Sequence, residues 1–257
     1  MLLLLSPAKT LDYERPLPRG VRQRATEPLF LPQAEGLIRI LKTLSPVQVA
    51  QLMSLSDELA ALNVARYALW QPEHDDRNSR PAVLAFNGDV YEGLDARSLR
   101  GADLGWAQQH LVILSGLYGA LRPLDRLQPY RLEMGTQLAN PRGRNLYEFW
   151  GPRIADALQE QARAAGAHEL VNLASQEYFR AVALERLTLA VITPVFKENR
   201  GGTLKIVSFS AKRARGAMAG FAIRHRLQRA GELKAFAEDG YRYEPALSTE
   251  REWLFVR

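Results

Sequence analysis

The chain has 257 residues and a formal net charge of +6, and it contains no cysteine. The missing cysteine excludes disulfides, Cys-ligated zinc and a cysteine nucleophile. With 47% hydrophobic residues the chain can bury a sizeable core, and we expect a single domain over residues 1–257. The four leucines before Ser6 are too short a run for a signal peptide or a membrane span, so we expect a soluble, cytoplasmic protein.

The basic residues are concentrated in one segment. Between Lys197 and Lys234 the sequence has ten Lys or Arg and two Glu, a local charge of +8 that exceeds the charge of the whole chain. Such a segment favours a polyanionic partner, namely nucleic acid, a nucleotide or an anionic membrane. A well-solvated basic helix face is the alternative interpretation.

Four short apolar runs each stop at a serine, and each is followed by a turn or a helix start. A strand that ends at a helix N-terminus presents free N–H groups and the positive end of the helix dipole, and both favour a bound phosphate. We therefore expect these strand ends to converge on one phosphate-rich ligand. The four junctions are LLLLSPAKT (2–10), LVILSGLYG (111–119), LVNLASQEY (170–178) and KIVSFSAKR (205–213).

The first junction predicts a strand over residues 2–5 and then a helix. Proline at the first helical position makes Ser6 the N-cap and places Lys9 in the first turn, where a cation opposes the helix dipole by about 0.3–1 kcal/mol unless an anion binds. Ser6, Lys9 and Thr10 are therefore candidate phosphate-binding residues, although their spacing is not that of a Walker A loop. A capped helix with a surface lysine is the alternative.

A pair of helices is expected next, after a Pro-rich surface excursion over residues 14–33. The first, over about 45–53, begins with the pattern of a capping box, and the second covers about 57–67. A tight helix–hairpin–helix can bind backbone phosphates through the N–H groups of its turn, which makes Ser54 and Ser56 candidates. Because this turn lacks the usual glycines, an ordinary helical hairpin is favoured.

The rest of the chain alternates strands with helices. Helices are expected over about 146–163, ending near Gly166, and from near Ala211 onward. The alternation indicates an α/β or mixed α+β domain, and the β-rich end from about residue 190 indicates some antiparallel pairing. The further expected strands are 82–86, 111–114, 170–174, 190–195, 203–209 and 253–256.

The second junction leads into a loop that is rich in charged and turn residues. Gly116 follows Ser115 directly and permits a ligand to approach the backbone closely. Two acids and two arginines then lie close together in sequence. They form either an internal salt-bridge network or a catalytic site, in which a carboxylate acts as general acid or base beside an arginine that binds phosphate. These four residues are Arg122, Asp125, Arg131 and Glu133.

Three residues are candidates for catalysis on a nucleotide or on a base in nucleic acid. Asp125 and Glu133 are the potential general acids or bases, and Lys9 is a potential nucleophile of the Schiff-base type. No pair of histidines has the spacing of metal ligands, so we expect no metal site and no cofactor.

The fourth junction opens into the basic segment. If Ser210 caps a helix there, small and apolar residues at helical spacing form a buried face, while Lys212 and Arg215 share one flank and Arg213 takes the other. The helix can then pack on the core and still present basic edges. Contacts from such edges to phosphates carry no sequence information, so binding through them is sequence-independent.

As a set, six motifs resemble the YaaA family of bacterial peroxide-stress proteins, in the same order along nearly the whole chain. The resemblance implies a single-domain α/β fold unlike the common superfolds, with a mixed sheet surrounded by helices, a positively charged cleft and a helix–hairpin–helix element. Residues 45–67 are the candidate for that element. The motifs are SPAKTLDY (6–13), AFNGDVYEGL (85–94), LSGLYGALRPLD with PYRLEMG (114–135), LYEFWG (146–151), NLASQEYF (172–179) and SFSAKRARGAM (208–218).

The resemblance also implies a function. It implies a cytosolic protein of the response to hydroperoxide that binds DNA and protects it or limits free iron, without an established reaction. We therefore expect a DNA-binding protein, favoured as a monomer and without a membrane partner, rather than an enzyme. The alternative is an enzyme that acts on a nucleotide or a nucleic-acid base through a phosphate-binding cleft. Direct binding of iron is not expected, since cysteine and paired histidines are absent.

Overall fold

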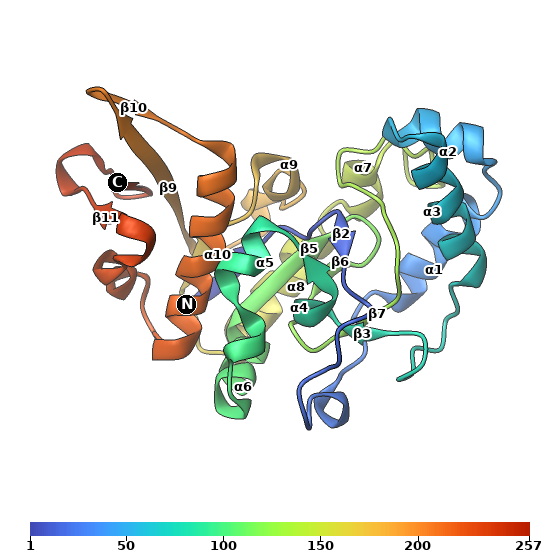
Figure 1. Ribbon diagram of the computed structural model, residues 1–257, viewed down its shortest axis with the longest axis horizontal. Coiled ribbons are helices and arrows are strands. Elements are labelled where there is room, and N and C mark those ends of the chain that lie inside the picture. Colours follow the sequence, from blue (N-terminus) through green and yellow to red (C-terminus); the bar gives the residue numbers. More distant parts are fainter.

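Five parallel strands form the centre of the fold. In the computed structural model, which describes residues 1–257, these strands belong to an eight-stranded sheet in the order β11-β12-β9-β8-β1-β5-β6, with β10 paired to β9 (Figure 1). Strands β6, β10 and β11 run antiparallel to their neighbours, so the sheet is mixed. The strands are β1 (Leu2–Leu5), β5 (Leu111–Ser115), β6 (Gly119–Leu121), β8 (Glu169–Asn172), β9 (Ala190–Arg200), β10 (Thr203–Lys205), β11 (Arg242–Tyr243) and β12 (Glu252–Val256).

Strand β1 lies in the middle of the sheet and is buried over its whole length. Its Leu3 is in register with Leu111 of β5 on one side and with Val171 of β8 on the other. A parallel strand that is covered on both faces needs an unbroken apolar sequence, and the four leucines of β1 provide it. The chain therefore places its first residues at the centre of the core.

Helices cover both faces of this sheet. Figure 1 shows α5, α6 and α10 in front of the strands and α8 behind them, while α1, α2 and α3 group together at the right. The helices are α1 (Leu31–Leu41), α2 (Pro46–Met53), α3 (Asp57–Leu69), α4 (Ala82–Ala85), α5 (Asp89–Leu94), α6 (Gly101–His110), α7 (Leu146–Trp150), α8 (Arg153–Ala164), α9 (Gln176–Phe179) and α10 (Ser208–His225). Short 3-10 segments cover Arg22–Arg24, Ala96–Ser98, Leu184–Arg186, Ala230–Ala235, Glu238–Gly240 and Pro245–Leu247.

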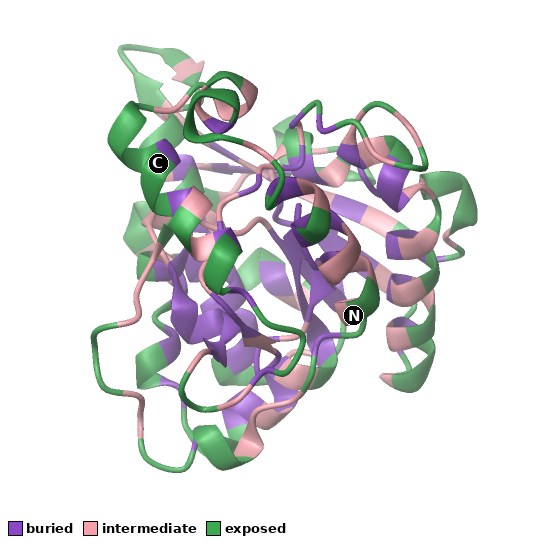
Figure 2. Cartoon of the chain, turned by 90° about the vertical axis from the view of Figure 1, so that its right-hand side faces the viewer, coloured by how far each residue is buried: buried purple, intermediate pink, exposed green.

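Two small antiparallel pairs lie beside the main sheet. Strand β2 (Thr10–Leu11) pairs with β4 (Phe86–Asn87), and β3 (Arg80–Pro81) pairs with β7 (Arg126–Leu127). The apolar core is continuous across the molecule, from Met1 to Phe255, and the buried residues of Figure 2 gather on the central strands and the helix faces against them. No helix combines the length and the apolar character that crossing a membrane requires.

Helices α5 and α10 pack unusually close together. A side chain at Gly216 of α10 would place its Cβ 1.7 Å from the carbonyl oxygen of Val90, and one at Gly93 of α5 would lie 2.1 Å from the carbonyl oxygen of Arg213. Only glycine permits this backbone contact. It fixes the middle turns of α10, residues 213–220, against α5.

The α/β fold class with a mixed sheet is confirmed, and four of the expected elements are wrong in detail. Residues 82–86 form helix α4 and the start of β4 rather than a strand, because a short buried apolar run has no period that separates the two. The expected helix over 146–163 is interrupted at Gly151, where φ is +49°. The strand expected over 203–209 ends at Lys205, and α10 begins at Ser208.

The helix expected after Ser6 is also absent. Thr10 and Leu11 instead continue as an extended strand, because they pair with Asn87 and Phe86 of β4. Partners 77 and 75 residues away in sequence thus override the local helix-start pattern.

Candidate functional site

The carboxyl ends of three neighbouring parallel strands, β8, β1 and β5, lie at one edge of the sheet. The chain leaves β1 toward β5 on one side and returns through α8 to β8 on the other, so β1 is the point at which the strand order reverses. In open α/β sheets, ligands bind in the crevice outside the carboxyl ends at such a switch point. This edge is therefore the first place to look for a site.

Two of the four serine junctions meet at this edge. The backbone N–H of Ser175, which follows β8, donates to Oγ of Ser6 over 2.8 Å, and the two hydroxyl oxygens are 3.3 Å apart. Tyr91 of α5 donates from its hydroxyl to the carbonyl oxygen of Ser6 over 3.0 Å. Ser175 occupies the N-cap position of α9, but its side chain makes no capping hydrogen bond.

Ser115 and Gly116 take a structural role, although the sequence predicts them as phosphate-binding residues. Ser115 is fully buried; its Oγ lies 2.6 Å from the hydroxyl of Tyr130 and accepts a hydrogen bond from the N–H of Tyr118 over 2.9 Å. A Cβ at Gly116 would lie 2.2 Å from the carbonyl oxygen of Leu132. The two residues thus hold the loop around Tyr130–Glu133 against the end of β5 and are not accessible to a ligand.

That loop carries a cluster of charges over the end of β1. Oε1 of Glu133 accepts from Nη2 of Arg131 over 2.9 Å and lies 3.2 Å from Nζ of Lys9. Its other oxygen, Oε2, is buried and has no hydrogen-bond partner. The side chains of Glu133 and Arg131 are 16% exposed, whereas that of Lys9 is 67% exposed. The structure therefore joins Lys9, Arg131 and Glu133, which the sequence predicts only as separate candidates.

A groove runs between the segment of residues 7–15 and the segment of residues 129–133. We call it the switch-point groove. At one end is a small hollow of about 10 Å³, lined by both segments and by Tyr178 of α9. At the other is an open hollow of about 390 Å³ whose lining includes Tyr13, Arg66 of α3 and Asn87 of β4.

Arg66 is half-buried in this groove and has no carboxylate partner. Its one hydrogen bond is a long one of 3.5 Å from Nη1 to Oδ1 of Asn63. Burial lowers the pKa of Arg66, and the neighbouring charge of Arg131 lowers it further, while Tyr13 and Tyr67 act in the opposite direction. An anion beside Arg66 would relieve the repulsion between the two guanidinium groups.

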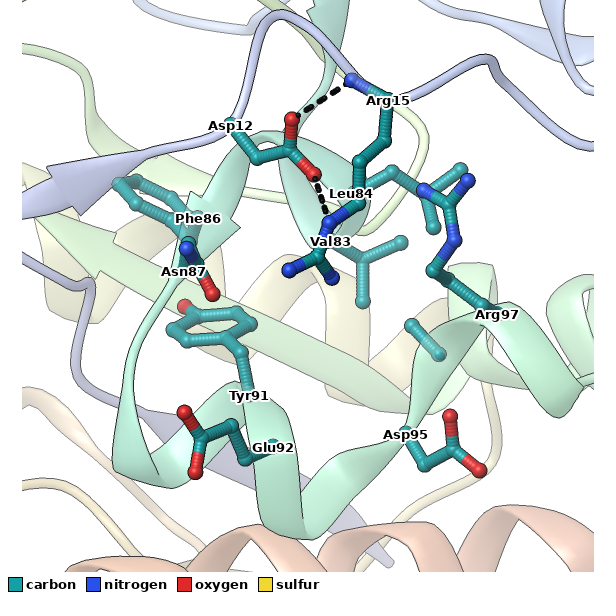
Figure 3. A pocket seen from close by; sticks show the side chains of 11 residues that line it. Asp12, Arg15, Val83, Leu84, Phe86, Asn87, Tyr91, Glu92, Asp95 and Arg97 are labelled. Carbon is teal, nitrogen blue, oxygen red and sulfur yellow. Dashed lines mark hydrogen bonds and ion pairs between the residues drawn. The ribbon is translucent and has the colours of Figure 1, made fainter.

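A second hollow of about 110 Å³ shares residues with the groove. Asp12, Arg15 and Asn87 line both hollows, and Figure 3 shows Asp12 hydrogen-bonded to Arg15, with Asn87 beside the ring of Tyr91. Asp12 accepts from the backbone N–H groups of Glu14 and Arg15 over 3.1 and 3.0 Å, and these contacts together with arginine charges lower its pKa despite partial desolvation. This carboxylate is therefore occupied in shaping the 12–15 turn.

Arg122 and Asp125 lie away from the switch-point groove. Strand β6 runs back from the carboxyl edge, so these two residues lie toward the opposite edge, near Gln108 at the end of α6. Asp125 is 1% exposed and accepts from Nη2 of Arg122 over 2.9 Å and from the hydroxyl of Thr26 over 2.6 Å. Burial raises its pKa although these partners oppose the shift. The salt-bridge interpretation holds for this pair, and Asp125 does not share a site with Glu133.

The first turns of α10 approach the groove from the other side. Nζ of Lys212 lies 3.9 Å from Asp89, the first residue of α5. The preceding residue, Gly88, lies next to Ala8 of the groove, since a Cβ at Gly88 would be 3.5 Å from the Cβ of Ala8. Arg215, one turn after Lys212, is half-buried, has no carboxylate within 4.0 Å and makes no side-chain hydrogen bond. Its burial lowers its pKa.

The other basic residues of α10 are held by acids. Arg213 pairs with Asp239 at 3.1 Å and Arg224 with Glu238 at 2.7 Å, so both face the same acidic segment. Ser210 lies inside the first turn rather than at the N-cap, which is Val207. The hydroxyl of Ser210 accepts from Nη2 of Arg257 over 2.9 Å. It therefore does not join Ser6 and Ser175, and the expected convergence of all four junctions is wrong for this one.

Comparison with known proteins finds sequence relatives over the whole chain. The family model described as peroxide stress protein YaaA matches residues 1–247. The chain belongs to the YaaA family. Among curated relatives it is 59% identical to a UPF0246 protein of Leptothrix cholodnii and 57% identical to one of Albidiferax ferrireducens, in both cases over 100% of this chain and 98% of the relative. A UPF0246 protein of Hahella chejuensis is 52% identical over 100% of this chain and 99% of its own.

The helical hairpin of this YaaA-family chain has the backbone of a tight turn but not the charge of a phosphate site. Ser54 adopts the left-handed conformation at φ +52°, where a glycine is usual, and the hydroxyl of Ser56 accepts from the N–H of Leu59 as the N-cap of α3. Asp57 and Glu58 occupy the first turn of α3, and no Lys or Arg lies between residues 42 and 66. Carboxylates at the N-terminus of α3 repel a phosphate. Binding of DNA by Ser54 and Ser56 therefore stays a prediction, and the charges around the turn do not favour it.

Sequence reasoning missed Arg66, Asn87 and Tyr178. Arg66 is a single basic residue on a helix, and nothing in its neighbourhood marks it. Asn87 stands in the YaaA motif AFNGDVYEGL, directly before a glycine with φ +153°, and that asparagine–glycine pair is the signal that could have found it.

Proposed function

We propose that the chain binds DNA through its backbone phosphates, independently of sequence, during the response to hydroperoxide. By covering DNA it limits oxidative damage and the consequences of free iron. Membership of the YaaA family supports the role in peroxide stress. The DNA contact is inferred from the distribution of free cations.

The observation that carries the proposal is the set of cations around the carboxyl edge of the sheet that lack a strong acidic partner. Arg66 and Arg215 have no carboxylate within 4.0 Å, and Lys212 is held only by an exposed contact of 3.9 Å to Asp89. Exposed ion pairs contribute about 0–1 kcal/mol, so a phosphate displaces Asp89 at little cost. Lys9, which is two-thirds exposed and whose Nζ lies 3.2 Å from Glu133, is a further accessible cation.

Ion pairs within the chain leave fewer free cations in the basic segment than its charge indicates. Arg213, Arg224 and Arg226 are each paired with an acid at 3.1 Å or less. We therefore assign the main contacts to Lys212 and Arg215 rather than to the whole segment, and Arg213 to a supporting role.

The test is the affinity for a labelled DNA duplex, measured by fluorescence anisotropy at several salt concentrations. About five phosphate contacts give a slope near −4.5 in log K against log salt. Replacing Lys212 and Arg215 by Gln together should reduce the magnitude of that slope by about 1.8 and weaken binding equally for unrelated sequences. The matched control is Arg163→Gln, an exposed arginine of α8 paired with Glu160, which should leave the slope unchanged. Absence of binding at low salt would contradict the proposal.

The role in stress is tested separately in cells exposed to hydrogen peroxide. Cells that carry the Lys212→Gln, Arg215→Gln variant should accumulate DNA strand breaks as cells without the protein do, while the Arg163→Gln variant should protect. Equal protection by all variants would separate the stress role from DNA binding. Chelatable iron is measured in the same cells, and a rise that does not depend on these residues would place the iron effect elsewhere.

A second candidate function is an enzyme that acts on a nucleotide or on a base in nucleic acid. The contact between Lys9 and Glu133, together with the partnerless Oε2 of Glu133, favours it. Borohydride trapping with abasic DNA tests Lys9 as a Schiff-base nucleophile. A trapped complex that disappears in Lys9→Gln supports an enzyme, and no trapping with unchanged biological activity of Lys9→Gln removes Lys9 from this role.

A further inference from the structure

We propose that the switch-point groove binds a single nucleotide unit, with its phosphate beside the cations of the groove and its base in the larger hollow. The unit is either a free nucleoside monophosphate or one unstacked or terminal nucleotide of DNA. The inference rests on the proposed DNA binding, which it deepens by assigning a pocket to one nucleotide.

The shape of the groove suits such a ligand. The hollow of about 390 Å³ lies within the usual range of small-molecule pockets, about 300–1,000 Å³. It opens beside the 7–15 segment, which leaves the end of β1 at the switch point of the sheet. The groove therefore combines sufficient volume with the position at which this class of sheet binds its ligands.

The charges of the groove favour a phosphate. The lining of the groove carries four cations and three carboxylates, so the cations exceed the acids by one. The cations are Lys9, Arg15, Arg66 and Arg131, and the carboxylates are Asp12, Glu14 and Glu133. Glu133 engages Lys9 and Arg131 with a single oxygen, and Arg66 is left without an acidic partner. A phosphate that contacts Arg66 also reduces the repulsion from Arg131, so an anion is more favourable here than at an isolated surface arginine.

Asn87 supplies a group that can read a base. Asn87 lines both this hollow and the neighbouring one, is half-buried, and its side-chain amide makes no hydrogen bond to any other residue of the chain. An asparagine amide offers a donor and an acceptor side by side, which matches the edge of adenine. The ring of Tyr13, which lines the same hollow, gives the base an aromatic neighbour.

Glu133 supplies an acceptor that the protein itself does not use. Its Oε2 is buried without a partner, and Glu133 lines the small hollow together with Tyr178. Buried carboxylate oxygens are almost always hydrogen-bonded, so a donor from outside the chain, either an ordered water or a ligand group, is expected here. A hydroxyl of a sugar or an amino group of a base meets that requirement, and inorganic phosphate at neutral pH meets it poorly.

The experiment is a calorimetric titration of the full chain with dAMP, dTMP, inorganic phosphate and a single-stranded oligonucleotide. The first variant is Asn87→Ala, which removes no hydrogen bond within the protein. The control is Gln51→Ala, an exposed amide of α2 away from the groove. Duplex DNA affinity is measured on the same samples, so that failure of the groove and failure of the proposed DNA binding are seen separately.

We expect dAMP to bind and Asn87→Ala to weaken it about tenfold, with Gln51→Ala unchanged and duplex affinity changed less than twofold. Free dAMP that binds as tightly as the oligonucleotide identifies a free nucleotide as the ligand, and binding by the oligonucleotide alone identifies DNA. The proposal is overturned if neither dAMP nor the oligonucleotide binds in a manner that depends on Asn87, or if inorganic phosphate binds as well as dAMP. Loss of duplex binding with dAMP binding intact contradicts the proposed function and leaves the groove as a nucleotide site.

Discussion

The contact between α5 and α10 should be intolerant of a single methyl group. Replacing Gly216 by Ala places a Cβ 1.7 Å from the carbonyl oxygen of Val90, 2.7 Å from its carbonyl carbon and 2.9 Å from the nitrogen of Leu94. All three neighbours are backbone atoms, so no side chain can rotate to make room. The two helices must move apart by about 1.5–2 Å to restore a normal van der Waals separation.

The magnitude follows from two opposing effects. Overpacking of a rigid contact costs about 3 kcal/mol at the upper end of its usual range, and exchanging glycine for alanine in a helix returns about 1 kcal/mol. The net loss of unfolding free energy is therefore about 2 kcal/mol, or a fall in Tm of about 4–8 °C for a chain of this size. Because the contact adjoins Lys212 and Arg215 on α10, salt-dependent DNA binding should weaken as well.

Urea unfolding followed by circular dichroism measures this loss. The matched control is Gly36→Ala in the middle of α1, where an added Cβ meets nothing within 4 Å. That variant should gain up to about 1 kcal/mol, so the two alanine variants should differ by about 3 kcal/mol. If Gly216→Ala is as stable as Gly36→Ala, the helices are not in the close contact described and the reasoning fails.

Two further predictions concern stability. His74 is buried, with Nε2 3.0 Å from the hydroxyl of Tyr118, and burial lowers its pKa from 6.5 to about 4. Because the imidazole of His74 binds a proton more readily in the unfolded chain, neutral His74 favours the folded state fully only above pH 6.5. This contribution to the free energy of unfolding is lost as the pH falls toward 4, and the loss between pH 7 and pH 5 is about 2 kcal/mol. Urea unfolding at both pH values should show a smaller loss in His74→Gln, and an unchanged loss would contradict the assignment. Ser45 and Gln48 form a capping box at the start of α2, so Ser45→Ala should cost about 1 kcal/mol in the same assay, and no measurable cost would show that the cap is unimportant.

The sequence predicts the parallel core well because its signals are local. The four leucines of β1 and the apolar run of β5 are unbroken, as strands buried on both faces require, and each stops at a polar residue at the carboxyl edge. The meeting of Ser6 with Ser175 follows from this pattern, since carboxyl ends of neighbouring parallel strands share one edge.

The rest of the site depends on contacts that are distant in sequence. Lys9 and Glu133 are 124 residues apart, and only the path of the loop held by Ser115 brings them together. The strand at Thr10 depends in the same way on β4. Arg213 forms an ion pair with Asp239, and no local sequence pattern predicts this contact. Counting charges along the chain therefore overestimates the basic surface, because the count does not show which arginines form ion pairs with acids distant in sequence.

The most direct test of the central claim is the crystal structure of the chain bound to a short DNA duplex. The account predicts phosphates at the carboxyl edge of the sheet, within hydrogen-bonding distance of Lys212 and Arg215 and close to Lys9. Phosphates bound instead at the Ser54–Ser56 turn of the helical hairpin, with the carboxyl edge free of DNA, would contradict it.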